Sequence, residues 1–149
     1  MNRMIASLIK QRLARNNIVE IRVSGTSMNP VLRDGDTINL YAKDEYCTGD
    51  IIVFSYNNFA GFLVHRVLLI QDEYYYCKGD NAFRLEKIQK SDIIGAVHIE
   101  NDKNNSEEFV HSSLLLYKLF ARLHFDKQRI VRTEQYQDYY QKYLKPSNR

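Results

Sequence analysis

The sequence contains little cysteine: its 149 residues include Cys47 and Cys77 and no C-x-x-C pair. Zinc sites and disulfide-rich folds need several cysteines at short, regular spacings. We therefore expect neither a cysteine metal site nor a disulfide framework, and no metal or other cofactor. Isolated cysteines of this kind fit a reducing cytoplasm.

Long apolar runs are also absent. A transmembrane helix needs about 20 mostly apolar residues, and the best stretch, 114–125, is shorter and is interrupted by Lys118 and Arg122. Residues 1–17 carry basic side chains within their apolar pattern and lack the continuous core and cleavage site of a secretory signal. The sequence thus predicts a soluble, cytoplasmic protein.

Neither positive nor negative charge is strongly in excess. The formal net charge is +3 and the sequence pI is about 8.8, well short of the dense Lys/Arg loading of a dedicated nucleic-acid binder. We expect no nucleic-acid partner. The chain is 44% hydrophobic and 26% charged, which is typical of one globular domain.

Hydrophobic periodicity divides the chain into three parts of a single domain. Residues 1–17 have apolar side chains at helical spacing and predict an amphipathic helix. Residues 18–100 hold short apolar or alternating runs between Gly, Asp and Asn turn signals, typical of a coiled, partly barrel-like β-sheet. Residues 101–149 begin with a polar loop and then return to helical spacing, which predicts C-terminal helices. The fold class is mainly β.

Four segments carry the polar groups suited to chemistry: Ser24-Gly25-Thr26-Ser27-Met28-Asn29-Pro30 followed by Asp34-Gly35-Asp36, then 49–54, 63–67 and 78–81. A serine hydroxyl is a poor nucleophile until a base removes its proton. Ser27 lies in a glycine-containing turn after a predicted strand, where its hydroxyl is exposed. Successive backbone N–H groups in such a turn can form an oxyanion hole.

A histidine is the natural partner for this serine, because imidazole changes charge near neutral pH. His65 lies within an apolar run that predicts a strand, which would hold its ring rigidly. A carboxylate would then fix the tautomer and stabilise the imidazolium. Asp80 and Glu86 are the nearest downstream candidates, and the residues alone do not decide between them.

Each of these residues also has a purely structural interpretation. Ser27 is a common turn residue, and a histidine in an apolar run is often a half-buried packing residue. Asp36, Asp50 and Asp80 each follow glycine and can cap turns through local backbone bonds. Met28 is expected to pack or to floor a substrate site. No single residue therefore indicates an enzyme.

The order of the segments along the chain, in contrast to any single residue, does indicate an enzyme. The series S-G-x-S-M-x-P, G-D, G-D-I-I-V-F, V-H-R-V and K-G-D-N, over roughly residues 19–99, resembles the signal peptidase family. It is also similar to the related self-cleaving repressor and mutagenesis-protein peptidases. The resemblance implies a coiled β-fold and attack by Ser27 on a scissile carbonyl. It also implies that Ser24, Thr26 and Met28 contact the substrate or the oxyanion.

The base distinguishes the branches of this superfamily. Common bacterial signal peptidases and self-cleaving repressors use lysine, whereas the matching position here is His65. That resembles the endoplasmic-reticulum and archaeal type, which uses Ser and His with an acidic residue after the G-D-N motif. Glu86, six residues past Asp80, is one candidate for that acid and Asp80 is the other.

The chain differs from these relatives in two ways. It has no predicted membrane anchor, and only about 18 residues precede the first predicted strand, too few for a DNA-binding domain. That short segment also contains no Ala-Gly or Cys-Gly self-cleavage site.

We therefore expect a soluble serine endopeptidase that cleaves a polypeptide precursor with a leader or signal-type peptide, through an acyl-enzyme. One alternative is an inactive peptide-binding module of the same fold. Another is a peripheral-membrane signal-type peptidase whose N-terminal helix and residues 114–125 lie in the interface; packing of both on the β-body is favoured.

Overall fold

The computed structural model describes residues 2–56, 61–82, 85–99 and 107–111. Its elements, in chain order, are α1 (Asn2–Ala14), β1 (Val19–Arg22), β2 (Thr37–Tyr41), β3 (Ile51–Tyr56), β4 (Gly61–Gln71), β5 (Tyr74–Lys78), β6 (Glu86–Gln89), a 3-10 turn (Lys90–Asp92) and β7 (Ile93–Val97). Residues 107–111 are helical. The C-terminal helices expected beyond residue 111 lie outside the described residues.

The strands form one antiparallel sheet in the order β1-β2-β7-β3-β4-β5-β6. Hairpin pairing accounts for most neighbours, but β7 enters between β2 and β3 and pairs with both. The prediction of a mainly β protein is confirmed. The barrel-like closure is wrong for the described chain, because the short edge strands β1 and β6 lie at opposite ends of the sheet and do not pair.

The sheet is buried on both faces at its centre, and β3 explains how. Ile51 and Val53 point into one apolar cluster, while Ile52 and Phe54 point into another. Successive side chains of a strand point to opposite faces, so a continuous apolar run fits a strand covered on both sides. This central strand is the neighbour of β4, which carries His65, and it gives that histidine a rigid support.

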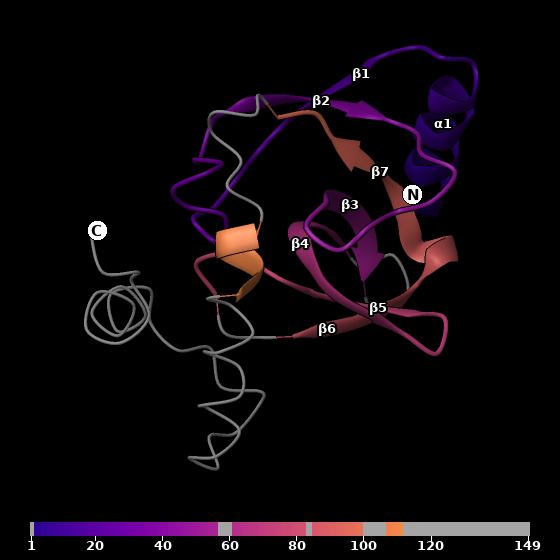
Figure 1. Ribbon diagram of the computed structural model, residues 1–149. Coiled ribbons are helices and arrows are strands. Elements are labelled where there is room, and N and C mark those ends of the chain that lie inside the picture. The colour runs from indigo at the N-terminus through magenta and orange to yellow at the C-terminus, as the bar shows by residue number, and fades with distance from the viewer. Residues whose placement is uncertain (1, 57–60, 83–84, 100–106, 112–149) are drawn as a thin grey trace.

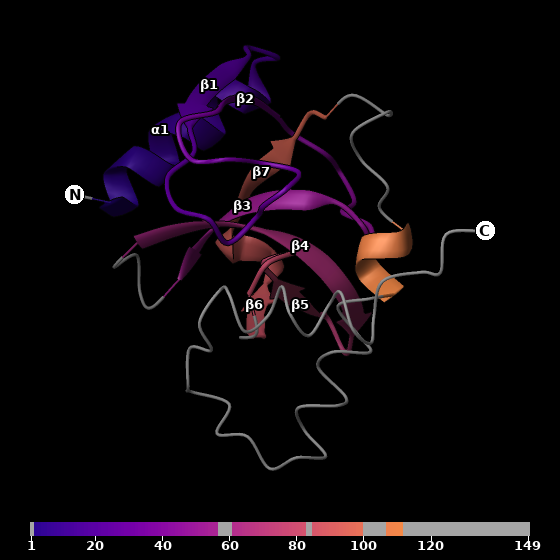
Figure 2. The ribbon, with the colours of Figure 1, turned by 90° about the vertical axis from the view of Figure 1, so that its left-hand side faces the viewer.

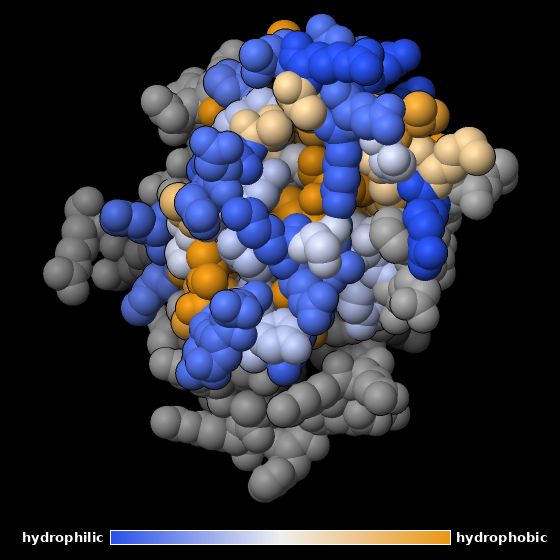
Figure 3. All heavy atoms as spheres, turned by 90° about the vertical axis from the view of Figure 1, so that its right-hand side faces the viewer, coloured by the Kyte–Doolittle hydropathy of each residue, from blue (hydrophilic) through white to orange (hydrophobic). Residues whose placement is uncertain are grey.

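Helix α1 covers one end of the sheet and packs on β1 and β7 (Figure 1). Both ribbon views place it at the opposite end of the molecule from residues 107–111 (Figure 2). Ala6 and Leu13 are buried in the contact, whereas Met4 and Leu8 remain 69% and 54% exposed. Figure 3 faces this side, where hydrophobic side chains lie among hydrophilic ones. No helix in the described part of the chain is both long and apolar enough to cross a membrane.

Candidate active site

The turn that carries Ser27 follows β1 and is held by the next turn along the chain. Gly25 has a φ of 87°, in the left-handed region that favours glycine, and its N–H donates to Asp34 Oδ1 at 2.7 Å. The N–H of Val23 donates to the carbonyl of Asp36 at 2.8 Å. The S-G-T-S motif and the D-G-D motif thus form one hydrogen-bonded unit that fixes the serine.

Ser27, His65 and Glu86 form a continuous hydrogen-bonded chain. Ser27 Oγ lies 3.2 Å from His65 Nε2, and His65 Nδ1 lies 3.0 Å from Glu86 Oε2. The three residues come from the turn after β1, from β4 and from β6, and His65 and Glu86 are 5% and 1% exposed. A carboxylate beside Nδ1 favours the tautomer with a proton there. The lone pair of Nε2 is then directed at the serine hydroxyl.

Asp80 has a different partner. Its two carboxylate oxygens accept from Arg66 Nε at 2.8 Å and from Arg66 Nη2 at 2.9 Å. Both side chains are fully buried, and Arg66 Nη1 also donates to the carbonyl of Gly49 at 2.9 Å. A bidentate pair of this kind fixes orientation as well as charge. Of the two candidate acids, the structure brings Glu86 to the histidine and Asp80 to the arginine beside it.

The K-G-D-N segment lies along the serine turn. The N–H of Asn81 donates to the carbonyl of Ser27 at 2.8 Å, and Asn81 Nδ2 donates to the carbonyl of Thr26 at 3.0 Å. The N–H of Asp80 approaches Met28 Sδ at 3.4 Å. Two motifs more than 50 residues apart are therefore joined by main-chain and side-chain bonds.

Gly79 is the point of closest approach between these motifs. A Cβ atom added there would lie 2.6 Å from the carbonyl oxygen of Ser27 and 3.1 Å from His65 Nε2. The first of these distances is far inside van der Waals contact, and the atom it meets is backbone. Only glycine lets the segment approach the site this closely.

The K-G-D-N segment begins with a buried lysine, Lys78. Lys78 is fully buried at the end of β5, and its Nζ donates to the carbonyl of Gly79 at 2.7 Å and to the carbonyl of Ala82. Burial lowers the pKa of Lys78 from its usual 10.5 to about 8, against the opposing attraction of Asp80 and Glu86. Sequence reasoning assigned no role to Lys78 or to Arg66. The signal was present, since a charged residue inside an apolar run must find a partner.

The remaining predicted site residues lie on both sides of the turn. Ser24 and Thr26 have exposed side chains near Ser27, where a substrate could reach them. Met28 is 2% exposed and belongs to an apolar core cluster; its contact with a substrate stays a prediction. Asp50 accepts from the N–H of Cys47, as expected for a turn residue.

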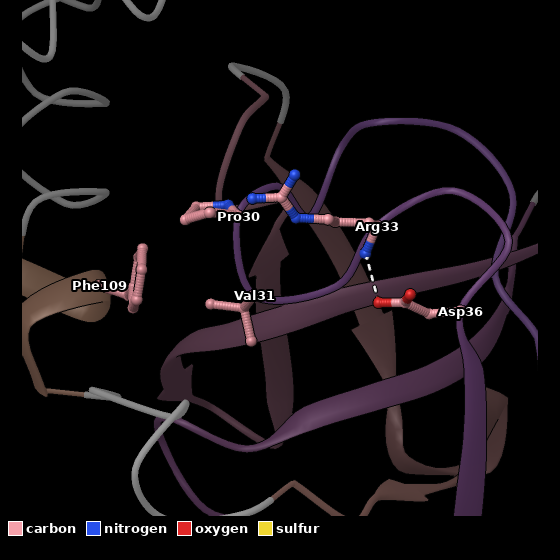
Figure 4. A pocket seen from close by; sticks show the side chains of 5 residues that line it. All are labelled: Pro30, Val31, Arg33, Asp36 and Phe109. Atoms are coloured by element: carbon pink, nitrogen blue, oxygen red, sulfur yellow. Dashed lines mark hydrogen bonds between the residues drawn. The ribbon is translucent and has the colours of Figure 1, made fainter.

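A hollow of about 400 Å³ begins three residues after Ser27. Figure 4 shows the ring of Phe109 facing Pro30 and Val31 across it, with Arg33 and Asp36 on the far wall. The Phe109 ring also lies 5.1 Å from the guanidinium carbon of Arg66. Residues 107–111 therefore bound the hollow and cover the buried arginine.

The antiparallel sheet thus holds a serine hydroxyl in hydrogen-bonding distance of a buried histidine, and that histidine in hydrogen-bonding distance of a buried carboxylate. The model of the Peptidase S24-like family matches residues 4–98, more than half of the chain. The chain therefore belongs to the Peptidase S24-like family, which points to a serine peptidase. The match contains Ser27, His65 and Glu86. No curated protein and no solved structure matches the chain.

Proposed function

We propose that this protein is a serine endopeptidase that uses Ser27 as nucleophile, His65 as general base and Glu86 as the acid that orients the histidine. The observation that supports it most is the unbroken Ser27–His65–Glu86 chain, with contacts of 3.2 and 3.0 Å. This geometry has the roles of a nucleophile, a base and an orienting group in the required order.

The reaction proceeds through an acyl-enzyme. His65 Nε2 takes the Ser27 proton as Oγ bonds to the scissile carbonyl carbon, and the carbonyl electrons move to its oxygen. The tetrahedral intermediate collapses when the imidazolium gives its proton to the departing amine. Water then attacks the ester with His65 again as base, which releases the acid product and restores the serine.

The oxyanion is stabilised by the turn itself. We place it beside the main-chain N–H of Ser27 and the exposed hydroxyl of Ser24, because donors fixed before the reaction stabilise developing charge most. The carbonyl of Thr26, which shares a peptide unit with the Ser27 N–H, already accepts from Asn81 Nδ2 at 3.0 Å, so this peptide unit does not need to reorganise.

The substrate is a polypeptide precursor with an extended leader or signal-type segment. β1 is an edge strand and leads directly to the serine turn, so an extended peptide can add beside it through main-chain hydrogen bonds. The hollow bounded by Pro30, Val31 and Phe109 can then receive a substrate side chain on the far side of Ser27.

The test uses a fluorophosphonate probe and a library of extended peptides. We expect the probe to label Ser27, as mapped by mass spectrometry, and both labelling and peptide cleavage to disappear in Ser27→Ala and His65→Ala. Ser55→Ala, which alters a buried serine of β3 away from the turn, is the matched control. Equal labelling of wild type and Ser27→Ala would contradict the proposal.

The protein incubated alone gives a further arm of this test. Cleavage in trans requires added peptide and depends on enzyme concentration, whereas self-cleavage is independent of concentration. Absence of both reactions, together with absence of labelling, would favour the peptide-binding module of the same fold.

A further inference from the structure

Lys78 is a buried charge that the reaction does not use. It is 0% exposed, and burying an ammonium is strongly unfavourable unless it is paired or hydrogen-bonded. Ser27 Oγ is in hydrogen-bonding distance of His65 Nε2, while the ammonium of Lys78 donates to two main-chain carbonyls. A role as general base therefore does not explain why Lys78 is buried at this position.

The two carbonyls belong to one tight turn. Gly79 and Ala82 accept from Lys78 Nζ, and the carbonyl of Gly79 also accepts the N–H of Ala82 at 3.1 Å. Asn81, inside the same turn, donates its N–H to the carbonyl of Ser27 at 2.8 Å. The ammonium of Lys78 thus links the two ends of this turn through their carbonyls, and the Asn81 N–H within the turn contacts the Ser27 carbonyl.

The tolerance at this contact is small. Gly79 lies so close to Ser27 and His65 that even a methyl group has no room. A turn that opened would lengthen and weaken the 2.8 Å Asn81–Ser27 bond and change the approach of the serine to the imidazole. Displacements of about 1 Å are sufficient to cost a site about 100-fold in rate.

We propose that Lys78 is a positioning residue of the Ser27–His65 site, which it serves by holding the 79–82 turn closed against the serine carbonyl. This inference rests on the proposed function. It adds a residue that touches neither the substrate nor the reacting atoms.

The charge of Lys78 has a second consequence. The ionisable groups that act on it are the carboxylates of Asp80 and Glu86 and the guanidinium of Arg66. Asp80 is neutralised by Arg66, whereas Glu86 also faces His65. Removal of the lysine cation therefore leaves the Glu86 carboxylate less compensated.

The first experiment compares Lys78→Met, an unbranched side chain that is one atom shorter and has no donor, with Lys78→Gln, which keeps a neutral donor. We expect the rate of fluorophosphonate labelling and kcat to fall by about 100-fold in Lys78→Met, with KM little changed, and less in Lys78→Gln. Lys87→Met, an exposed lysine of β6 that lies over the ring of Tyr74, is the control and leaves both readouts unchanged.

The second experiment does not depend on activity. Hydrogen exchange at the Asn81 and Ala82 amides is measured in wild type, Lys78→Met and Lys87→Met. We expect faster exchange at both amides in Lys78→Met alone, while amides of β3 keep their protection.

The outcomes separate the two proposals. Wild-type labelling with unchanged kinetics and exchange in Lys78→Met overturns the role of Lys78 and leaves the proposed function intact. Failure of both Lys78 variants to fold also overturns it, because the lysine would then support the core rather than the site. If wild-type Ser27 is never labelled, the proposed function fails, and the exchange data decide whether Lys78 holds the turn.

Discussion

The two halves of the sheet are stabilised in different ways. Around α1, β1, β2 and β7 the interior is apolar, with Leu13, Leu40 and Ile94 among its members. Around β4, β5 and β6 the interior also contains charged and polar side chains, all 5% exposed or less: His65, Arg66, Lys78, Asp80, Asn81 and Glu86. Apolar burial is favourable without a partner, whereas each buried charge requires one. Both halves contain an apolar cluster, but only the second half also has to pair buried charges with one another and with main-chain groups.

The largest effect is expected at Glu86. Glu86→Gln keeps the shape of the side chain but removes the charge that stabilises the imidazolium and selects the tautomer, so kcat should fall about 10⁴-fold, as at the equivalent group of serine proteases. Peptide cleavage measures it, with the exposed Glu45→Gln as control. Activity within tenfold of wild type would remove Glu86 from the mechanism.

Asp80→Asn tests the neighbouring carboxylate, for which we expect a loss of stability first. It breaks the fully buried pair with Arg66 and leaves an uncompensated cation, which typically costs about 3–5 kcal/mol. Chemical denaturation measures the free energy of unfolding. If Asp80→Asn were as stable as wild type but as inactive as Glu86→Gln, the assignment of the two acids would be reversed.

Leu13→Ala tests the apolar half. Leu13 is 3% exposed in the contact of α1 with the sheet, and truncation of such a leucine costs about 2–5 kcal/mol. The activity of the folded fraction should remain that of wild type, because no charged group of the site is altered. A matched loss of activity at a temperature where the variant is fully folded would show that the two halves are coupled.

The smallest effect is the pH dependence that Lys78 gives to stability. Its pKa is about 8 in the folded protein and 10.5 ordinarily, so between these values the unfolded chain binds more protons. Stability from this group therefore rises with pH across that window and is constant below it. The difference in unfolding free energy between wild type and Lys78→Met, measured from pH 7 to 10, should grow in favour of wild type. A constant difference would contradict it.

Much of this molecule could be predicted from local pattern. Alternation and Gly/Asp turns predicted the strands, and the basic apolar segment predicted a helix where α1 lies. The open form of the sheet could not be predicted, because it depends on β7 pairing between β2 and β3 and on the edge strands β1 and β6, which do not pair. Pairing across the chain leaves no local signal.

The site shows the same limit. Ser27 and His65 stand out by residue type and motif. The choice between Asp80 and Glu86 depends on the face of the sheet that each carboxylate reaches. Arg66 follows His65 in β4, so the two side chains point to opposite faces of the sheet. Glu86 reaches the face of His65 and Asp80 that of Arg66. A sequence spacing of six residues does not contain that information.

The side chains of the proposed catalytic site are widely separated along the chain, at 27, 65 and 86, and the carbonyl of Ser27 accepts a hydrogen bond from the N–H of Asn81. A ribosome releases these segments one after another, so the nucleophile emerges long before its base and its orienting acid. Because Glu86 lies on β6, the proposed site is complete only when β6 has joined the sheet. The proposed activity is therefore coupled to the completion of this part of the sheet during synthesis.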